Sequence, residues 1–163
     1  MKTAYFAGGC FWCIAALLDT FKGVQKIISG YSGGDEVNPT YEEVKAQKTG
    51  HRETIKVIYD ENITSYEELL TMFLNNIDPF DNGGQFIDRG HSYTTAVYYL
   101  DNKEKELAEK HLRNIEKENN KKTAVKVEPF KSFYDAEEYH QNFHLKNPEK
   151  IKEEFISSGR KKI

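Results

Sequence analysis

Residues 2–18 read KTAYFAGGCFWCIAALL, and this stretch decides how the fold begins. Lys2 to Ala7 are typical of a short strand, and Gly8-Gly9 predict a turn into a helix that runs from Cys10 to Phe21. Apolar side chains recur at helical spacing on most sides of this helix, which indicates that it is buried. We therefore expect a strand and a buried helix packed together at the start of an α/β domain.

The rest of the chain also alternates strands with helices, without an internal repeat or a linker. The charged run in the second half keeps apolar residues at helical spacing and holds i,i+4 ion pairs, which predicts a solvated helix. We predict a two-layer α/β sandwich in which residues 1–163 form one domain. The expected strands are Val24–Tyr31, Thr54–Tyr59, Ala96–Leu100 and one around Val125 and Val127. Three further helices are expected: one that begins at Ser65, with a capping box to Glu68, one over Asn102–Lys122 and one over Ala136–Phe143.

The composition is that of a soluble globular protein, with 38% hydrophobic and 30% charged residues among 163. The net charge of −3 offers no basic field, so we expect neither nucleic acid nor a membrane surface as a partner. The longest apolar stretch, Cys10 to Leu18, is far shorter than a bilayer span. Only six residues precede Ala7, too few for the hydrophobic region of a secretion signal. We therefore expect an unprocessed, cytoplasmic protein.

Both cysteines, Cys10 and Cys13, lie in the segment AGGCFWC. In a cytosolic chain, two such thiols are more often reactive or metal-binding than structural. A helix N-terminus stabilises a thiolate, so we expect Cys10 to have a lowered pKa and to be reactive. Cys13, a turn further along an apolar helix, also fits a buried small residue.

Three other kinds of site are compatible with two such thiols. Cys10 and Cys13 with His140 and His144 have the inner spacings of a zinc site, but more than a hundred residues separate the pairs, whereas compact fingers use about 12–15. We therefore expect no metal. A general dithiol–disulfide oxidoreductase would need only the two cysteines. A cysteine hydrolase would need a histidine base, and His51, like the other histidines, has no local signature tying it to Cys10.

Two long loops, Ser32–Arg52 and Asp78–Thr94, contain aromatic residues, which argues for order and function. Glu53 follows the first loop and enters an apolar strand, where desolvation would favour its acid form and make it a candidate general acid. An ordinary solvated glutamate at a strand start is the plainer alternative. In the same way, Asp88 fits a simple turn, and Tyr41 and Tyr93 fit core aromatics.

Taken in order along the chain, these segments resemble the peptide methionine sulfoxide reductase A family. The Gly-Cys-Phe-Trp motif is its most specific part, and the matching segments extend over nearly the whole chain. They are Gly9-Cys10-Phe11-Trp12, Gly30-Tyr31, Asn38-Pro39-Thr40-Tyr41, Gly50-His51-Arg52-Glu53, Asp78-Pro79, Gln85-Phe86-Ile87-Asp88-Arg89-Gly90, Tyr93, Phe133-Tyr134, Glu138-Tyr139-His140-Gln141 and Ser158-Gly159-Arg160.

The resemblance implies an α+β fold with a mixed sheet and a ferredoxin-like core. It also implies that Cys10 attacks the sulfur of an S-configured methionine sulfoxide, protein-bound or free, and becomes a sulfenic acid. Glu53 would protonate the sulfoxide oxygen. The other implied roles are hydrogen bonds to that oxygen from Tyr41 and Tyr93, ordering of water by Asp88, and a methyl-binding wall of Phe11 and Trp12.

No bound cofactor is implied, but an external thiol reductant is, either thioredoxin or a small dithiol. The resolving cysteines that many family members carry near the C-terminus, or at the position of Lys45, are absent. Cys13 stands where many members have glycine. Because positions i and i+3 share one side of a helix, Cys13 is a candidate resolving cysteine, and direct reduction of Cys10 by an external thiol stays open beside it.

Overall fold

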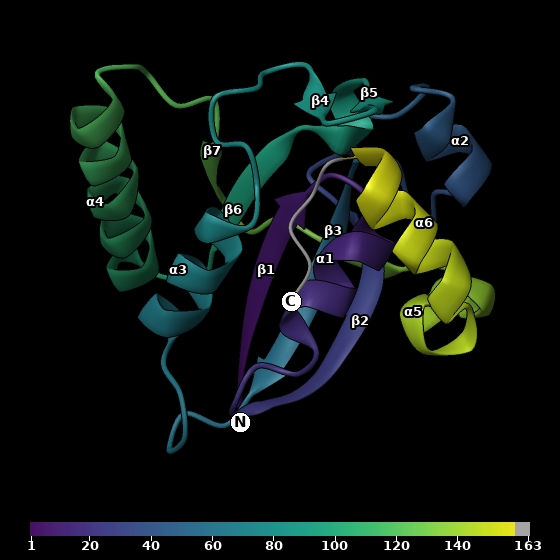
Figure 1. The fold of residues 1–163 in the computed structure, drawn as a ribbon, viewed down its shortest axis with the longest axis horizontal. Helices are drawn as coiled ribbons and strands as arrows, with labels where there is room; N and C mark the ends of the chain where they lie inside the picture. The colour runs from purple at the N-terminus through teal and green to yellow at the C-terminus, as the bar shows by residue number, and fades with distance from the viewer. Residues whose placement is uncertain (159–163) are drawn as a thin grey trace.

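The computed structural model describes residues 1–158, and its centre is a six-stranded mixed sheet (Figure 1). The strand order is β7-β6-β1-β3-β2-β8, and a two-stranded hairpin, β4–β5, lies apart from this sheet. All neighbours in the large sheet are antiparallel except β6 and β7. The strands are β1 (Lys2–Gly8), β2 (Val24–Ser32), β3 (Arg52–Tyr59), β4 (Gly84–Gln85), β5 (Asp88–Arg89), β6 (Thr95–Tyr99), β7 (Lys126–Pro129) and β8 (Phe133–Asp135).

Four strands and two helices form a ferredoxin-like core. In chain order these are β1, helix α1 (Phe11–Leu18), β2, β3, helix α3 (Tyr66–Asn75) and β6. Their order within the sheet is β6-β1-β3-β2, with antiparallel neighbours, as in a split β-α-β fold. This confirms the predicted α+β class, the mixed sheet and the ferredoxin-like core.

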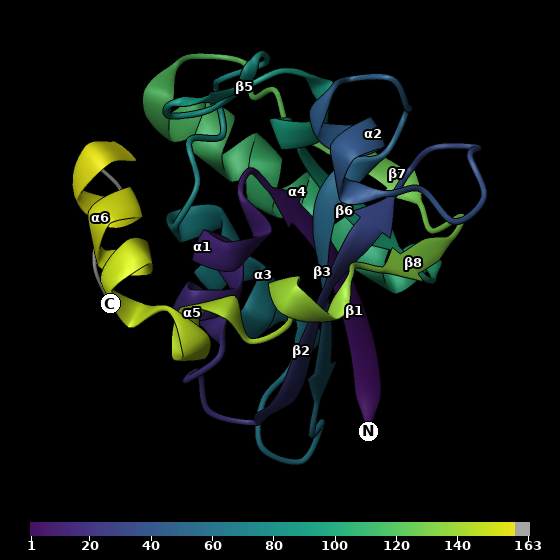
Figure 2. The ribbon, with the colours of Figure 1, turned by 90° about the vertical axis from the view of Figure 1, so that its right-hand side faces the viewer.

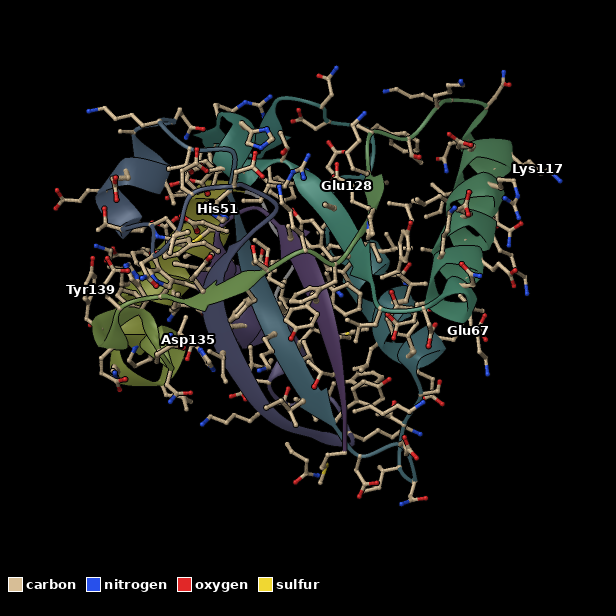
Figure 3. All side chains as sticks on the ribbon, turned by 180° about the vertical axis from the view of Figure 1, so that it is seen from behind. His51, Glu67, Lys117, Glu128, Asp135 and Tyr139 are labelled. Atoms are coloured by element: carbon tan, nitrogen blue, oxygen red, sulfur yellow. The ribbon has the colours of Figure 1, made fainter. Side chains whose placement is uncertain are left out.

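Alternating side chains of β1 divide the core between the two faces of the sheet. Phe6 faces the helices, where its ring stacks on Phe73 of α3 with centroids 4.7 Å apart. Tyr5 faces the other way and stacks on Phe130, 4.2 Å away, in the segment between β7 and β8. Figures 1 and 2 show α1 and α3 on one side of the sheet, and Figure 3 shows the other side, with Glu128 of β7 and Asp135 of β8 toward its two edges.

Several predicted elements form with shifted ends. The first helix stops at Leu18, before the turn at Gly23, whose φ of +86° suits glycine. The solvated helix is α4 (Asn102–Asn119), and β3 begins at Arg52, so that Glu53 lies within the strand. At Ser65 only half of the predicted capping box forms, because the Glu68 carboxylate accepts a hydrogen bond from Thr64.

The helix predicted over Ala136–Phe143 is wrong. A single 3-10 turn, η2 (Glu138–His140), is followed by Asn142 with a φ of +53° and then by helix α5 (Phe143–Lys146). The physical reason is Gln141, whose side-chain amide exchanges two hydrogen bonds of 2.9 Å with the main chain of Ser29 in β2. This pairing holds the segment against the sheet edge.

Both long loops carry structure that the sequence patterns did not predict. The first contains helix α2 (Tyr41–Lys45), started by a capping box between Thr40 and Glu43. The second contains the β4–β5 hairpin and a 3-10 turn, η1 (His91–Tyr93). A further helix, α6 (Pro148–Ser158), follows α5. In the tail motif, Gly159 and Arg160 lie outside the described residues, and over residues 1–158 no helix combines the length and apolarity that a bilayer span requires.

Candidate active site

Cys10 occupies the junction between β1 and α1. It is the N-cap of the helix, and its carbonyl accepts hydrogen bonds from the N–H groups of Cys13 and Ile14 at 3.1 and 3.2 Å. Gly9 makes the turn with a φ of +88°, and a Cβ on Gly8 would lie only 2.7 Å from the Phe73 ring. The two glycines therefore allow the strand to pass directly into the helix, which puts the thiol at the helix N-terminus.

The Cys10 thiol is only 7% exposed, and its pKa lies well above the ordinary value. The largest cause is a hydrogen bond with the thiol of Cys13, followed by burial, and nearby Glu53 adds to both. The backbone N–H of Cys13 acts in the opposite direction but is outweighed. The expected lowered pKa of Cys10 is therefore wrong, because the neighbouring thiol and burial outweigh the helix terminus.

Glu53 is the buried acid beside this thiol. Its side chain is 1% exposed, and burial is the largest of the causes that raise its pKa to about 8. Asp88 raises the pKa further, whereas a hydrogen bond from the Phe11 N–H to Oε1, at 3.1 Å, and the charge of Lys45 lower it. Oε2 has no hydrogen-bond partner within residues 1–158. The neutral acid therefore holds an O–H group that can donate to a ligand.

Two tyrosines stand beside the acid, each with a hydroxyl of raised pKa. Burial is the main cause for both Tyr41 and Tyr93, and the Glu53 carboxyl is the second. Their side chains are hydrogen-bonded to one another. Tyr41 is fixed at the start of α2 by its backbone N–H, which donates to Glu137 at 2.9 Å. Both hydroxyl groups therefore stay protonated over the physiological pH range and can act as donors.

These side chains line a cavity of about 200 Å³. Six of the residues singled out in the sequence meet there, although they come from five different elements. Phe11 and Cys13 do not line the cavity. Three charged side chains to which the sequence assigned no role in the site, Lys45, Lys150 and Glu154, do line it. The lining residues are Cys10, Trp12, Tyr41, Lys45, Glu53, Asp88, Tyr93, Lys150 and Glu154.

The Trp12 ring, which forms part of the cavity wall, is held in place by two contacts. It stacks on Phe143 with centroids 3.8 Å apart, and its Nε1 donates to Nδ1 of His140 over 3.0 Å. Burial lowers the pKa of His140, which keeps the ring neutral and able to accept. Phe11, only 1% exposed, packs behind the cavity, 6.4 Å from the Tyr41 ring. Trp12 thus lines the cavity, while Phe11 supports it from behind.

The histidines considered as ligands or bases are engaged elsewhere. His140 faces Trp12, and Nε2 of His144 lies 2.8 Å from a carboxylate oxygen of Asp19. His51 contacts the main chain of Gly34 and Glu36. In the part of the chain that the structure describes, no group of three His, Cys, Asp or Glu side chains is placed to hold a metal ion.

The family model described as peptide methionine sulfoxide reductase matches residues 2–163. The chain belongs to this family. It is 44% identical over 161 residues to the peptide methionine sulfoxide reductase MsrA of Bacillus licheniformis, covering 98% of this chain and 89% of the relative. It is 40% identical over 160 residues to MsrA 2 of Staphylococcus aureus, covering 97% and 90% of the two chains.

Solved structures of family members share the fold. Reduced Mxr1 from Saccharomyces cerevisiae superposes with a TM-score of 0.85 at 28% identity, covering 90% of this chain and 86% of the other. Methionine sulfoxide reductase A of Corynebacterium diphtheriae gives a TM-score of 0.82 at 27% identity, with 90% and 75% covered. The ferredoxin-like core described above is therefore the fold of peptide methionine sulfoxide reductases.

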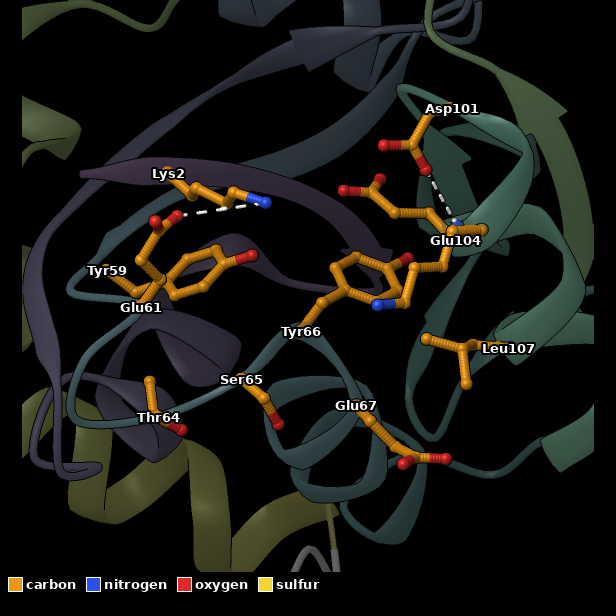
Figure 4. A pocket seen from close by; sticks show the side chains of 11 residues that line it. Lys2, Tyr59, Glu61, Thr64, Ser65, Tyr66, Glu67, Asp101, Glu104 and Leu107 are labelled. Atoms are coloured by element: carbon orange, nitrogen blue, oxygen red, sulfur yellow. Dashed lines mark hydrogen bonds and ion pairs between the residues drawn. The ribbon is translucent and has the colours of Figure 1, made fainter.

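In this member of the peptide methionine sulfoxide reductase family, a second cavity, of about 280 Å³, lies away from the thiols (Figure 4). Its polar groups stabilise the fold: Asp101 caps α4 through the N–H of Glu104 at 2.9 Å, and Lys2 pairs with Glu61 at 3.7 Å. The Glu104 carboxylate in turn accepts the N–H of Leu100 at 3.0 Å. This cavity therefore lies between the start of α4 and the sheet, and no cysteine lines it.

Proposed function

We propose that this chain reduces the S-epimer of methionine sulfoxide to methionine, with residues 1–163 acting as one catalytic domain. The observation that carries the proposal is the shared cavity of the Cys10 thiol and the Glu53 acid, whose pKa is about 8. A neutral sulfoxide becomes a good electrophile at sulfur only when its oxygen is protonated. A buried acid that is neutral at pH 7 and has a free Oε2 is suited to that task.

The proposed chemical step transfers the sulfoxide oxygen to the enzyme. The Cys10 sulfur attacks the substrate sulfur while Glu53 gives its proton to the oxygen, and the proton of the Cys10 thiol passes to the Glu53 carboxylate and restores the acid. Tyr41 and Tyr93 donate hydrogen bonds to that oxygen, Asp88 orders water, and Trp12 contacts the methyl group. Methionine leaves, and Cys10 retains the oxygen as a sulfenic acid, so that a thiol and a sulfoxide become a sulfenic acid and a thioether.

Regeneration is proposed to pass through Cys13. Its thiol is hydrogen-bonded to the Cys10 thiol, and the two residues are one helical turn apart at the N-terminus of α1. Attack of Cys13 on the sulfenic acid would form a Cys10–Cys13 disulfide and release water. An external dithiol, thioredoxin or a smaller one, would then reduce this disulfide in the cytoplasm. No bound cofactor takes part.

Turnover of enantiomerically resolved substrates with dithiothreitol as the reductant tests the proposal. We expect reduction of the S-sulfoxide and none of the R-sulfoxide. Activity on the R form alone, or on neither form, would overturn it. After one stoichiometric turnover without a reductant, mass spectrometry should show the loss of two hydrogens, as expected for the disulfide. A gain of one oxygen would instead leave the sulfenic acid for direct reduction by an external thiol.

A further inference from the structure

A cavity lined by basic side chains lies at the edge of the sheet where β3, β6 and β7 all begin. Its volume is about 420 Å³, within the roughly 300–1,000 Å³ that is usual for small-molecule sites. We call it the basic cavity, because no Asp or Glu of residues 1–158 lines it. The lining residues are Arg52, Phe80, Asn82, His91, Thr94, Lys122, Thr123, Ala124 and Lys126.

Arg52 is the buried cation of the basic cavity. It is only 6% exposed, and its Nε donates a hydrogen bond of 2.7 Å to the Thr94 hydroxyl. Its Nη1 donates to the Tyr98 hydroxyl and to the carboxylate of Glu128, which is labelled in Figure 3, at 3.1 and 3.2 Å. Nη2 has no hydrogen-bond partner within residues 1–158. The guanidinium is therefore held rigidly and still has a donor for an oxyanion, the group that its planar fork of N–H bonds suits.

Two exposed lysines, Lys122 and Lys126, lie on the segment that enters β7. Neither has an ion-pair partner within residues 1–158. The main chain between them is fixed, because the N–H of Ala124 donates to the carbonyl of Pro79 over 2.6 Å. Thus two further positive charges stand on an anchored segment, and the cavity has three permanent cations in its wall.

Phe80 forms the largest apolar part of the wall. Its ring is partly buried, and the ammonium of Lys121, which does not line the cavity, lies 5.0 Å from its centroid. Aromatic rings stack on flat apolar groups in an offset or tilted arrangement. The basic cavity therefore combines cationic donors with a surface on which an organic group can lie.

We propose that the basic cavity binds a small phosphate monoester, with the phosphate at Arg52 and the two lysines and the organic group against Phe80. Such a phosphate carries a charge of about −1.5 to −2 at pH 7 and has three acceptor oxygens, whereas a carboxylate carries a single charge. The basic cavity shares no lining residue with the active-site cavity. Since Arg52 and Thr94 directly adjoin Glu53 and Tyr93 in the chain, the bound phosphate would lie behind the active site, outside the chemical step.

The experiment titrates the ¹⁵N-labelled full chain with phenyl phosphate, inorganic phosphate or benzoate at fixed ionic strength and pH 7.5, followed by NMR. Phenyl phosphate should shift, in a saturable way, the amide signals of Thr123, Ala124 and Lys126 and the side-chain Nε–H signal of Arg52. It should bind roughly two- to tenfold more tightly than inorganic phosphate, because its ring stacks on Phe80. Benzoate has the same ring but one charge fewer, and should bind several-fold more weakly than phenyl phosphate.

Two pairs of lysine variants test the charges. Lys122→Gln and Lys126→Gln should each raise the Kd of phenyl phosphate about two- to fivefold, as expected for a charge at an exposed position. Lys110→Gln and Lys117→Gln, at exposed positions of α4 that do not line the basic cavity, remove the same charge and should keep the Kd of the wild-type protein.

Three results would overturn the inference. The first is a lack of saturable shifts, or shifts confined to the active-site cavity around Trp12. The second is an equal rise in Kd in all four lysine variants, which diffuse attraction to the overall charge predicts. The third is benzoate binding as tightly as phenyl phosphate, which would exclude the phosphate as the recognised group. Sulfoxide reduction should be unchanged in all four variants, so this test is independent of the proposed function.

Discussion

The backbone N–H of Phe11 donates a hydrogen bond of 3.1 Å to Oε1 of Glu53, a residue 42 positions further along the chain. Phe11 is the first residue of α1, where backbone N–H groups lack partners within the helix. The hydrogen bond therefore gives this N–H group an acceptor and connects the acid of β3 to the helix that begins after Cys10. It also leaves Oε2 as the oxygen that can donate a proton.

Glu53→Gln should slow sulfoxide reduction while leaving substrate binding largely intact. The amide can still accept from Phe11 but cannot donate a proton, and general acid catalysis contributes about 10²- to 10⁴-fold. We expect kcat to fall within that range and KM to change little. Glu61→Gln, at an exposed position outside the active-site cavity, is the control and should keep full activity. A fully active Glu53→Gln protein would remove Glu53 from the role of general acid.

The pH dependence of the rate should show an alkaline limb near pH 8, because Glu53 has a pKa of about 8 and must be protonated to act. Two neighbours should shift this limb in opposite directions. Asp88→Asn removes a charge that raises the pKa of Glu53, so the limb should shift to lower pH. Lys45→Gln removes a charge that lowers it, so the limb should shift to higher pH. Unchanged limbs in both variants would show that another group titrates.

The stability of the protein should depend on pH through the same carboxyl. The pKa of Glu53 is raised from 4.5 to about 8, so between these values the folded state holds a proton that the unfolded chain releases. This contribution to the free energy of unfolding is fully present below pH 4.5 and is lost as pH rises through 8. In Glu53→Gln the loss should be absent. Urea unfolding of both proteins at pH 5, 7 and 9 measures it, and parallel curves would contradict the assignment.

Replacing each cysteine alone should affect sulfoxide reduction in different ways. Cys10→Ser should abolish sulfoxide reduction, because the nucleophile is gone. Cys13→Ser should still release one methionine per chain in a single turnover. The protein should then carry one extra oxygen on Cys10 instead of a disulfide. Rapid quench and mass spectrometry distinguish the two. Full steady-state activity of Cys13→Ser with thioredoxin would exclude Cys13 as the resolving residue.

His140→Ala should raise KM more than it lowers kcat, because His140 touches Trp12 and contributes nothing to proton transfer. Losing the 3.0 Å hydrogen bond from Nε1 frees the indole ring and should destabilise the fold by about 1–3 kcal/mol. Trp12 is the only tryptophan in the chain, so its fluorescence reports the change directly. His144→Ala, which contacts Asp19 instead, should leave the emission maximum in place.

Local patterns predicted much of the fold, and the family resemblance implied most of the residues that line the cavity. Helical and alternating spacing located β1, α1, β2 and α4, because those segments bury one face of a regular element. The helix expected over Ala136–Phe143 failed because Gln141 pairs with the main chain of Ser29, a contact between segments far apart in the sequence. For the same reason, Pro148 and the spacing of Ile151 and Phe155 are compatible with a helix, but no local signal indicates that it lies beside Cys10.

The sequence by itself determined which chemistry-bearing residues the chain holds and that Cys10 lies between a strand and a helix. Motif order and periodicity can be read from the sequence alone, because they depend only on which residues follow one another. Only the tertiary structure decided the protonation states, because the pKa values of Cys10 and Glu53 are raised by burial and by neighbours from other segments. It also decided that α6 places Lys150 and Glu154 at the cavity, since the packing of a helix depends on surfaces that the rest of the chain creates.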